Sequence, residues 1–221
     1  GTGAMTLTGS TTDLNAYLDT ASNITYLHGT ANLNGDNADT INVVVNDNGN
    51  TGSGGGTDQN LGTVNVDIGA VNDTPDVVAP GSAYTVNEQT NLSIHGTGFS
   101  VSDVDAGSGT ITATLDVGEG IVTVAAGDSG ITIGSGNGTG SVALTGTLTQ
   151  INHLLTGAGT GSIVYSNASN TPSANTTITL TVNDGGNTGT DPGLTGDGSR
   201  EEDATSQTIN ITATNDDPTN E

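Results

Sequence analysis

Short runs of alternating apolar and polar residues, separated by turns rich in glycine and asparagine, follow one another from residue 83 to residue 214. In "TITATLDV" (110–117), threonine or aspartate alternates with an apolar side chain at every step. Such a period of two is typical of β-strands with one buried face. The pattern predicts strands at residues 83–88, 91–95, 110–117, 121–126, 131–135, 141–146, 162–166, 176–182 and 207–214.

Two segments depart from this alternation and predict short helices. "TLTQINHLL" (147–155) spaces its apolar residues as one face of a helix does, and "STTDLNAYL" (10–18) is its counterpart near the start of the chain. "GEG" (118–120) predicts a tight hairpin turn. We therefore expect an all-β fold of tandem immunoglobulin-like or cadherin-like β-sandwich modules, with a short helix in each and an incomplete first module.

An internal repeat sets the boundaries of these modules. "GTGAMTLTG" (1–9) matches "GTGSVALTG" (138–146) and "VVVNDNGNTG" (43–52) matches "LTVNDGGNTG" (180–189), both with an offset of 137 residues. The linkers "DIGAVNDTP" and "NITATNDDP" match with an offset of 143. We interpret residues 1–75 as the C-terminal half of a module plus its linker, either truncated or naturally split. Residues 76–217 form a complete module and residues 218–221 begin the next linker.

The strong negative charge of the chain limits the classes of molecule that it can bind. The chain has 24 acidic residues, one basic residue and a formal net charge of −23, with no cysteine for disulfides. This charge argues against nucleic acid as a partner, and no stretch is apolar enough for insertion into a membrane. A halophilic solvation shell and a set of metal sites both remain as explanations. Most of the acids lie in predicted loops, which favours metal sites.

The segment "VSDVDAGSG" (101–109) carries the strongest candidate site. Asp103 and Asp105 are two residues apart, so on an extended segment their side chains point the same way. Successive antiparallel strands bring this segment, the linker and the end of strand 176–182 to one pole of the module. Calcium binds six to eight oxygen ligands of this kind. The sequence predicts a calcium site made by Asn72, Asp73, Asp103, Asp105 and Asp184, approached by Asp36 and Asp39 of the first module.

The opposite pole is predicted to hold half of a second calcium site. Glu88 ends the first predicted strand near the linker residues Asn215 and Asp216, and Glu119 lies in the "GEG" turn. The other ligands would come from a further module. Asp47 is the equivalent of Asp184 in the first copy, and its partners are likewise expected outside this sequence.

Other kinds of site fit less well. An EF-hand loop counted from Asp103 has Thr114 where the twelfth position needs glutamate. Paired carboxylates also occur in glycoside hydrolases, but aromatic residues for a sugar platform make up only 2% of the chain, and we expect no enzyme. The alternative function is a module that binds glycan or protein through the few tyrosines, namely Tyr17, Tyr26, Tyr84 and Tyr165.

The "VNDTP" linker, the glutamate near the end of the first strand, "DVDAGSG" and "VNDGGNTG" together resemble the extender repeats of giant bacterial RTX adhesins. These cadherin-like domains are also classed as VCBS or tandem-95 type repeats. The resemblance implies a cell-surface or secreted bacterial protein, exported by a type I system, whose modules are made rigid by Ca²⁺ at their junctions. It also implies a monomer whose partners are neighbouring modules of the same chain, with host-cell or surface ligands bound by other domains.

Overall fold

The computed structural model of the protein describes residues 3–30, 32–50, 56–187, 189 and 201–215. The chain divides into two compact units, Gly1–Ile68 and Gly69–Glu221, which are described separately below. Strands make up most of the regular structure, and the described residues include two short helices. The prediction of a mainly β fold is confirmed.

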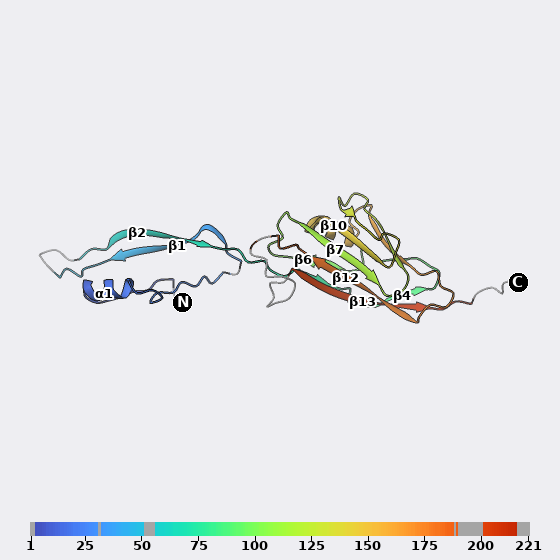
Figure 1. Ribbon diagram of the computed structural model, residues 1–221, viewed down its shortest axis with the longest axis horizontal. Helices are drawn as coiled ribbons and strands as arrows, with labels where there is room; N and C mark the ends of the chain where they lie inside the picture. Colours follow the sequence, from blue (N-terminus) through green and yellow to red (C-terminus); the bar gives the residue numbers. More distant parts are fainter. Residues whose placement is uncertain (1–2, 31, 51–55, 188, 190–200, 216–221) are drawn as a thin grey trace. The chain divides into compact units, whose positions relative to one another are not determined.

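The first unit consists of one helix and one β-hairpin (Figure 1). Helix α1 (Thr11–Leu18) begins at Ser10, whose side chain accepts a hydrogen bond from the Asp13 amide at 3.2 Å. Such a cap satisfies one of the amides left free at a helix N-terminus. Strands β1 (Gly35–Val45) and β2 (Gln59–Ile68) pair antiparallel, and none of their described residues is buried. None of the described residues of this unit is buried, so its described part is a hairpin and a helix without a core.

The described strands of the second unit form three sheets. The largest has the strand order β4-β13-β12-β7-β10-β9, the next has the order β5-β11-β8, and β3 pairs with β6. All these pairs are antiparallel except β13–β4, which is parallel. The strands are β3 (Asp76–Val78), β4 (Tyr84–Asn87), β5 (Leu92–Ser93), β6 (Ser100–Ser102), β7 (Thr110–Val117), β8 (Ile121–Ala125), β9 (Thr132–Ile133), β10 (Ser141–Thr147), β11 (Ser162–Ser166), β12 (Asn175–Asn183) and β13 (Glu202–Thr212).

The core of the second unit lies between the six-stranded and the three-stranded sheet. Every second residue of β7 is buried, from Ile111 to Leu115, and these residues share one cluster with Ile163 and Tyr165 of β11. Helix α2 (Leu148–Leu155) adds its buried face to the same cluster. A capping box starts this helix, because Thr147 accepts from the Gln150 amide and the Gln150 side chain accepts from the Thr147 amide.

The structure differs from the predicted elements in several places, and the predicted strands at 91–95 and 131–135 are reduced to the two residues of β5 and of β9. Strands β3 and β6 were not predicted, because three residues are too few to show a period of two. Strand β13 begins at Glu202, ahead of the predicted start at residue 207. The "GEG" segment is not a hairpin turn, because β7 and β8 belong to different sheets and the chain crosses between them here. Gly120 has a φ of 91°, and a Cβ there would lie 2.7 Å from the Ser166 carbonyl oxygen, so this crossing needs glycine.

Candidate metal centre

The pairing of β3 with β6 brings the two halves of the candidate site to one end of the second unit. Asp76 lies opposite Ser102, so the residues before β3 and those after β6 are neighbours. Asn72 and Asp73 precede β3, and Asp103 and Asp105 follow β6. The predicted convergence is therefore present, but the strand that returns the chain is β6 and not the predicted strand at 91–95.

The end of β12 supplies a third acidic residue from a distant part of the sequence. Asp184 follows Asn183, the last residue of β12, and its amide donates to the Glu201 carbonyl at 3.0 Å. The side chain of Asp184 is fully buried, as is that of Asn72. Carboxylates are rarely buried to this extent unless they are hydrogen-bonded or bind a metal.

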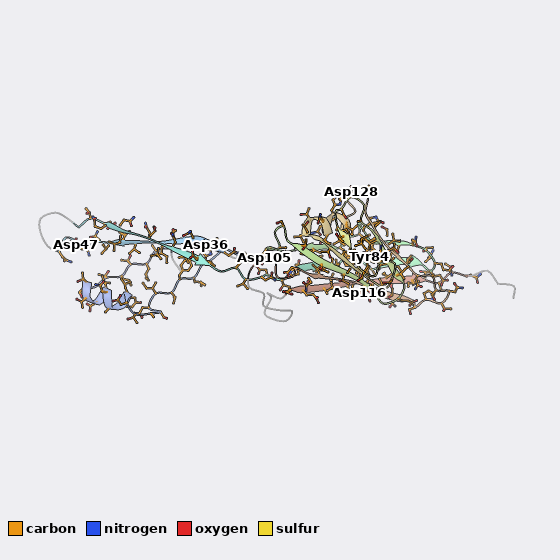
Figure 2. All side chains as sticks on the ribbon, turned by 45° about the horizontal axis from the view of Figure 1, so that its top comes forward. Asp36, Asp47, Tyr84, Asp105, Asp116 and Asp128 are labelled. Atoms are coloured by element: carbon orange, nitrogen blue, oxygen red, sulfur yellow. The ribbon has the colours of Figure 1, made fainter. Side chains whose placement is uncertain are left out.

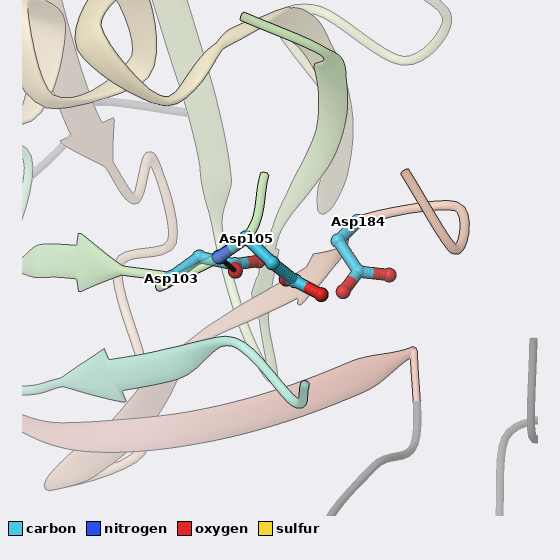
Figure 3. A group of neighbouring side chains, drawn as sticks. All are labelled: Asp103, Asp105 and Asp184. Atoms are coloured by element: carbon cyan, nitrogen blue, oxygen red, sulfur yellow. Dashed lines mark hydrogen bonds between the residues drawn. The ribbon is translucent and has the colours of Figure 1, made fainter. Parts of the chain in front are cut away.

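Asp103, Asp105 and Asp184 form a compact group of carboxylates (Figure 3). One oxygen from each lies within 4.8 Å of the corresponding oxygens of the other two. Figure 3 shows the carboxylates of Asp105 and Asp184 directed toward one another. Three such groups around one point repel one another unless protons or a cation neutralise them. An arrangement of this kind could hold a metal ion.

Backbone amides hold these side chains in place. Asp103 Oδ1 accepts from the amides of Asp105 at 3.0 Å and Ala106 at 3.1 Å, and Asp105 Oδ2 accepts from the Asp73 amide at 3.0 Å. Asp184 Oδ1 accepts from the Gly186 amide at 2.9 Å. The linker is therefore tied to the "DVDAG" segment, and main-chain amides hold each of the three carboxylates.

Buried oxygens without a hydrogen-bond partner lie at this site. They include Asn72 Oδ1 and Asp103 Oδ2, and the hydroxyl of the nearby Thr74 is likewise buried without a partner. The other end of the Asn72 amide donates to Asp184 Oδ2 at 2.9 Å. Leaving a buried acceptor unsatisfied costs about 1–3 kcal/mol. A cation bound by these oxygens would remove that cost, because it takes the place of the missing donors.

Burial, followed by the neighbouring Asp105 carboxylate, raises the pKa of Asp103 to about 6. Both causes disfavour the charged form of Asp103. A bound cation acts in the opposite direction and favours the charged form. Protons and a metal ion would therefore compete for this side chain.

Glu88, predicted for the second site, is also buried, with 2% of its surface exposed. Its Oε1 accepts from the amide of Thr214 at 2.5 Å and from the Thr214 hydroxyl at 3.1 Å, whereas Oε2 is buried without a partner. Asn215 follows in the chain, and Asp216 lies outside the described residues. The structure thus places Glu88 beside the linker that follows β13, as the sequence pattern indicated, and the second site stays a prediction.

Glu119 is held by a neighbouring loop. It accepts from the Asn167 side chain at 2.8 Å and from the Ser173 amide at 3.1 Å. The hydrogen bond from Asn167, followed by those from Ser173, lowers the pKa of Glu119. These contacts give Glu119 a structural role in fixing residues 167–173, and its predicted role as a ligand is not tested by them.

The predicted ligands of the first unit lie at and near β1, where Figure 2 labels Asp36 and Asp47. Asp39 accepts from the Tyr26 hydroxyl at 2.6 Å and from the Thr40 amide at 2.7 Å, and the Tyr26 hydrogen bond is the main cause that lowers its pKa. Asp47 accepts from the Gly49 amide at 2.9 Å. Asp36 is exposed. A role for these three residues in metal binding remains a prediction.

Thr74 is the residue of this site that the sequence pattern did not single out. Its hydroxyl is buried within the linker "VNDTP", next to the predicted ligands Asn72 and Asp73. Its place inside the repeated linker motif was the one feature of the sequence that could have indicated its role. Threonine is common in this chain, however, and its side chain alone does not mark a site.

The described part of the chain contains no helix with the length and apolar character needed to cross a membrane. No protein-family model matches the sequence, and no curated protein matches it.

Proposed function

We propose that the second unit is a calcium-stabilised structural module of a large extracellular adhesin. The group of Asp103, Asp105 and Asp184 carries this proposal, because it gathers three carboxylates from two distant segments at the point where the linker enters the unit. All the side-chain atoms there that could coordinate a metal ion are oxygens. An oxygen-only set with carboxylates and an amide suits Ca²⁺, which tolerates irregular coordination, better than it suits Mg²⁺ or zinc.

In this proposal the ion acts by binding the linker to the body of the module. Asn72 and Asp73 already contact Asp184 and Asp105 through hydrogen bonds. An ion shared by these residues would add a stronger connection and would neutralise part of the formal net charge of −23. Residues 69–75 would then be fixed relative to the module, and a chain of such modules would stay extended.

The finer fold class is part of the same proposal. Two sheets enclose one core, and the early strand β4 pairs in parallel with the last strand, β13. Both features support a cadherin-like or immunoglobulin-like module. The adhesin context and the extracellular location rest on the internal repeat, the acidic composition without cysteine and the resemblance of the linker motifs. Projection of a distant ligand-binding region would be the task of such a repeat.

Thermal unfolding of the whole chain with Ca²⁺, with EGTA and with Mg²⁺ tests this function. We expect Ca²⁺ at a hundred times its dissociation constant to stabilise the second unit by about 2.7 kcal/mol, seen as a rise in Tm. Mg²⁺ at the same concentration should give a much smaller rise. Hydrogen exchange in the linker at residues 70–75 should slow when Ca²⁺ is added. Equal Tm values and unchanged exchange in Ca²⁺ and EGTA would contradict the proposal.

A further inference from the structure

Two of the three carboxylates of the candidate site follow a strand pair that has little stability of its own. Asp103 and Asp105 come directly after β6, and among the described strands β6 pairs only with β3, over three residue pairs. An isolated pair of strands is at best marginally stable in water. The groups that hold the outer edges of β3 and β6 therefore decide where these two carboxylates lie.

Side chains from other elements of the second unit hold both outer edges. The Val77 amide of β3 donates to Asp203 Oδ2 of β13 at 3.1 Å. On β6, the Val101 amide donates to Asn152 Oδ1 at 3.0 Å, and the Val101 carbonyl accepts from Asn152 Nδ2 at 2.7 Å. Asn152 belongs to α2, so one side chain ties β6 to this helix through two hydrogen bonds.

The Asn152 side chain serves β6 as a neighbouring strand would. A side-chain amide presents a donor and an acceptor side by side, and here both pair with the backbone of a single residue. Val101 is 5% exposed, so water has little access to its amide and carbonyl. Leaving both groups unpaired there is costly, and Asn152 therefore fixes the edge of β6 against α2.

The connection from this edge to the carboxylates is short. One residue separates Val101 from Asp103. Asp103 Oδ1 accepts from the amides of Asp105 and Ala106, and Ala106 is 2% exposed. The turn that carries the two carboxylates is thus hydrogen-bonded within itself and buried at its far end. A displacement of Val101 would therefore move both carboxylates relative to Asp184.

We propose that Asn152 is a positioning residue of the metal site, through which helix α2 sets the affinity for Ca²⁺. This inference rests on the proposed function, because it concerns the ion that the three carboxylates would bind. The hydrogen bonds of the Asn152 side chain go to Val101 and not to a carboxylate, so it acts through β6. Such coupling is reciprocal, and the bound ion should in turn strengthen the contact between β6 and α2.

A second asparagine provides a matched control. Asn137 makes the same pair of hydrogen bonds to Val124 of β8, at 2.7 Å from the amide and 2.9 Å to the carbonyl. Strand β8 lies at the edge of the three-stranded sheet and carries none of the three carboxylates. Asn137→Ala and Asn152→Ala therefore remove the same two hydrogen bonds from an edge strand, and only one of these strands leads to the site.

Calorimetric titration of the whole chain with Ca²⁺ compares wild type with both variants. The binding that Asp184→Asn abolishes identifies this site in the titration. Asn152→Ala should weaken that binding about tenfold, because the ion must then order β6 as it binds, and Asn137→Ala should change it less than about twofold. In wild type, Ca²⁺ should slow hydrogen exchange at the Val101 amide about fivefold or more and leave the Val124 amide unchanged.

Asn152→Asp is a second variant of nearly the same size. It keeps an acceptor for the Val101 amide and removes the donor to the Val101 carbonyl. The added negative charge would by itself strengthen the binding of a cation. We expect an affinity between those of wild type and Asn152→Ala, and tighter binding than in wild type would contradict the positioning role.

Equal affinity of wild type and Asn152→Ala would overturn the inference, and so would equal weakening by Asn137→Ala, which would indicate a general loss of stability. In EGTA, exchange at the Asp105 and Ala106 amides should be faster in Asn152→Ala than in Asn137→Ala. Equal rates would show that Asn152 does not hold the carboxylates in place. A wild type that binds no Ca²⁺ contradicts the proposed function as well, whereas wild-type binding that Asn152→Ala leaves unchanged contradicts this inference alone.

Discussion

The two copies of the hairpin show what this sequence specifies locally and what it specifies through distant contacts. Both copies, β1 with β2 and β12 with β13, form two paired strands, whose registers agree from Asp39 to Val43 and differ by one residue from Val44, where β2 has a bulge. Both start their helix with a hydroxyl cap, at Ser10 or Thr147. Among the described residues, Ile178 and Leu180 of the second copy are buried, whereas the equivalent Ile41 and Val43 of the first are 38% and 39% exposed. Hairpin and helix therefore follow from local sequence, whereas the core and the carboxylate group of the second unit require the strands from β3 to β9.

The acidic residue after each hairpin strand shows the same contrast. Asp184 is fully buried, accepts from the Asn72 side chain and faces Asp105. Asp47, at the equivalent position, is exposed and accepts from the Gly49 amide within its own turn. The motif "VND" thus positions the carboxylate in the turn, and the linker and the "DVDAG" segment make it part of a site.

Replacement of one isoleucine in each copy should give the largest difference. Ile178→Ala removes a fully buried side chain and should lower the free energy of unfolding of the second unit by about 2–5 kcal/mol. Ile41→Ala at the equivalent, 38% exposed position should change stability by less than about 0.5 kcal/mol. Urea unfolding followed by circular dichroism measures both. Similar losses from the two changes would mean that β1 already has a core in the free chain.

Asparagine at the two equivalent acidic positions tests the site itself. Asp184→Asn keeps an oxygen for the Gly186 amide but removes a charge, so most of the Ca²⁺-dependent stabilisation of about 2.7 kcal/mol should be lost. Asp47→Asn should leave the Ca²⁺-dependent rise in Tm of the second unit unchanged. The contrast fails if both variants keep the full response to Ca²⁺, or if both lose it.

The raised pKa of Asp103 predicts a smaller effect of pH on the protein in EGTA. The pKa is about 6 in the folded chain against an ordinary value of 3.8, so the folded state holds this proton more tightly than the unfolded state. The resulting stability is fully present below about pH 3.8 and is lost as the pH rises through about 6. Asp103→Asn removes this contribution. The difference in urea midpoint between wild type and Asp103→Asn should therefore fall from pH 4 to pH 7. A difference that stays constant over this pH range would contradict the prediction.

The helix caps should give the smallest effects. Thr147→Ala removes the acceptor for the Gln150 amide and should destabilise the second unit by about 1 kcal/mol, because α2 packs on the core. Ser10→Ala removes the equivalent cap from α1, which has no buried residue. Its effect should be confined to fraying, measured as faster exchange of the Asp13 amide with no change in urea midpoint. A global destabilisation by Ser10→Ala would indicate that α1 packs as α2 does.

The spacing of apolar residues and the helix-capping residues were sufficient to predict most of the long strands and helices. The predicted strands at 110–117 and 162–166 have the bounds of β7 and β11, and the predicted helix at 147–155 differs from α2 by one residue. Strands β3 and β6 could not be predicted, because each is three residues long and exists through pairing with the other. The crossing at Gly120 was missed for a similar reason, since glycine serves both a hairpin and a passage between sheets.

The candidate site was more predictable than these short strands. Asp103, Asp105 and Asp184 were expected together from the order of strands, and the structure brings them together. The burial of polar side chains at the site could not be predicted from sequence patterns. That Asn72 has a buried oxygen without a donor, or that Glu88 is almost fully covered, depends on contacts between residues more than a hundred positions apart.

The parallel pairing of β4 with β13 has a mechanical consequence. Tyr84 lies beside Ile209 and Asn87 beside Thr212, so the chain enters this ladder at one end and leaves it at the other. Tension applied through the two linkers pulls the strands past each other in shear and loads all four register pairs at the same time. An antiparallel pair pulled from one end would instead unzip bond by bond at a lower force. The pairing of β4 with β13 would therefore resist tension applied at Tyr84 and Thr212 better than an antiparallel pair pulled from one end.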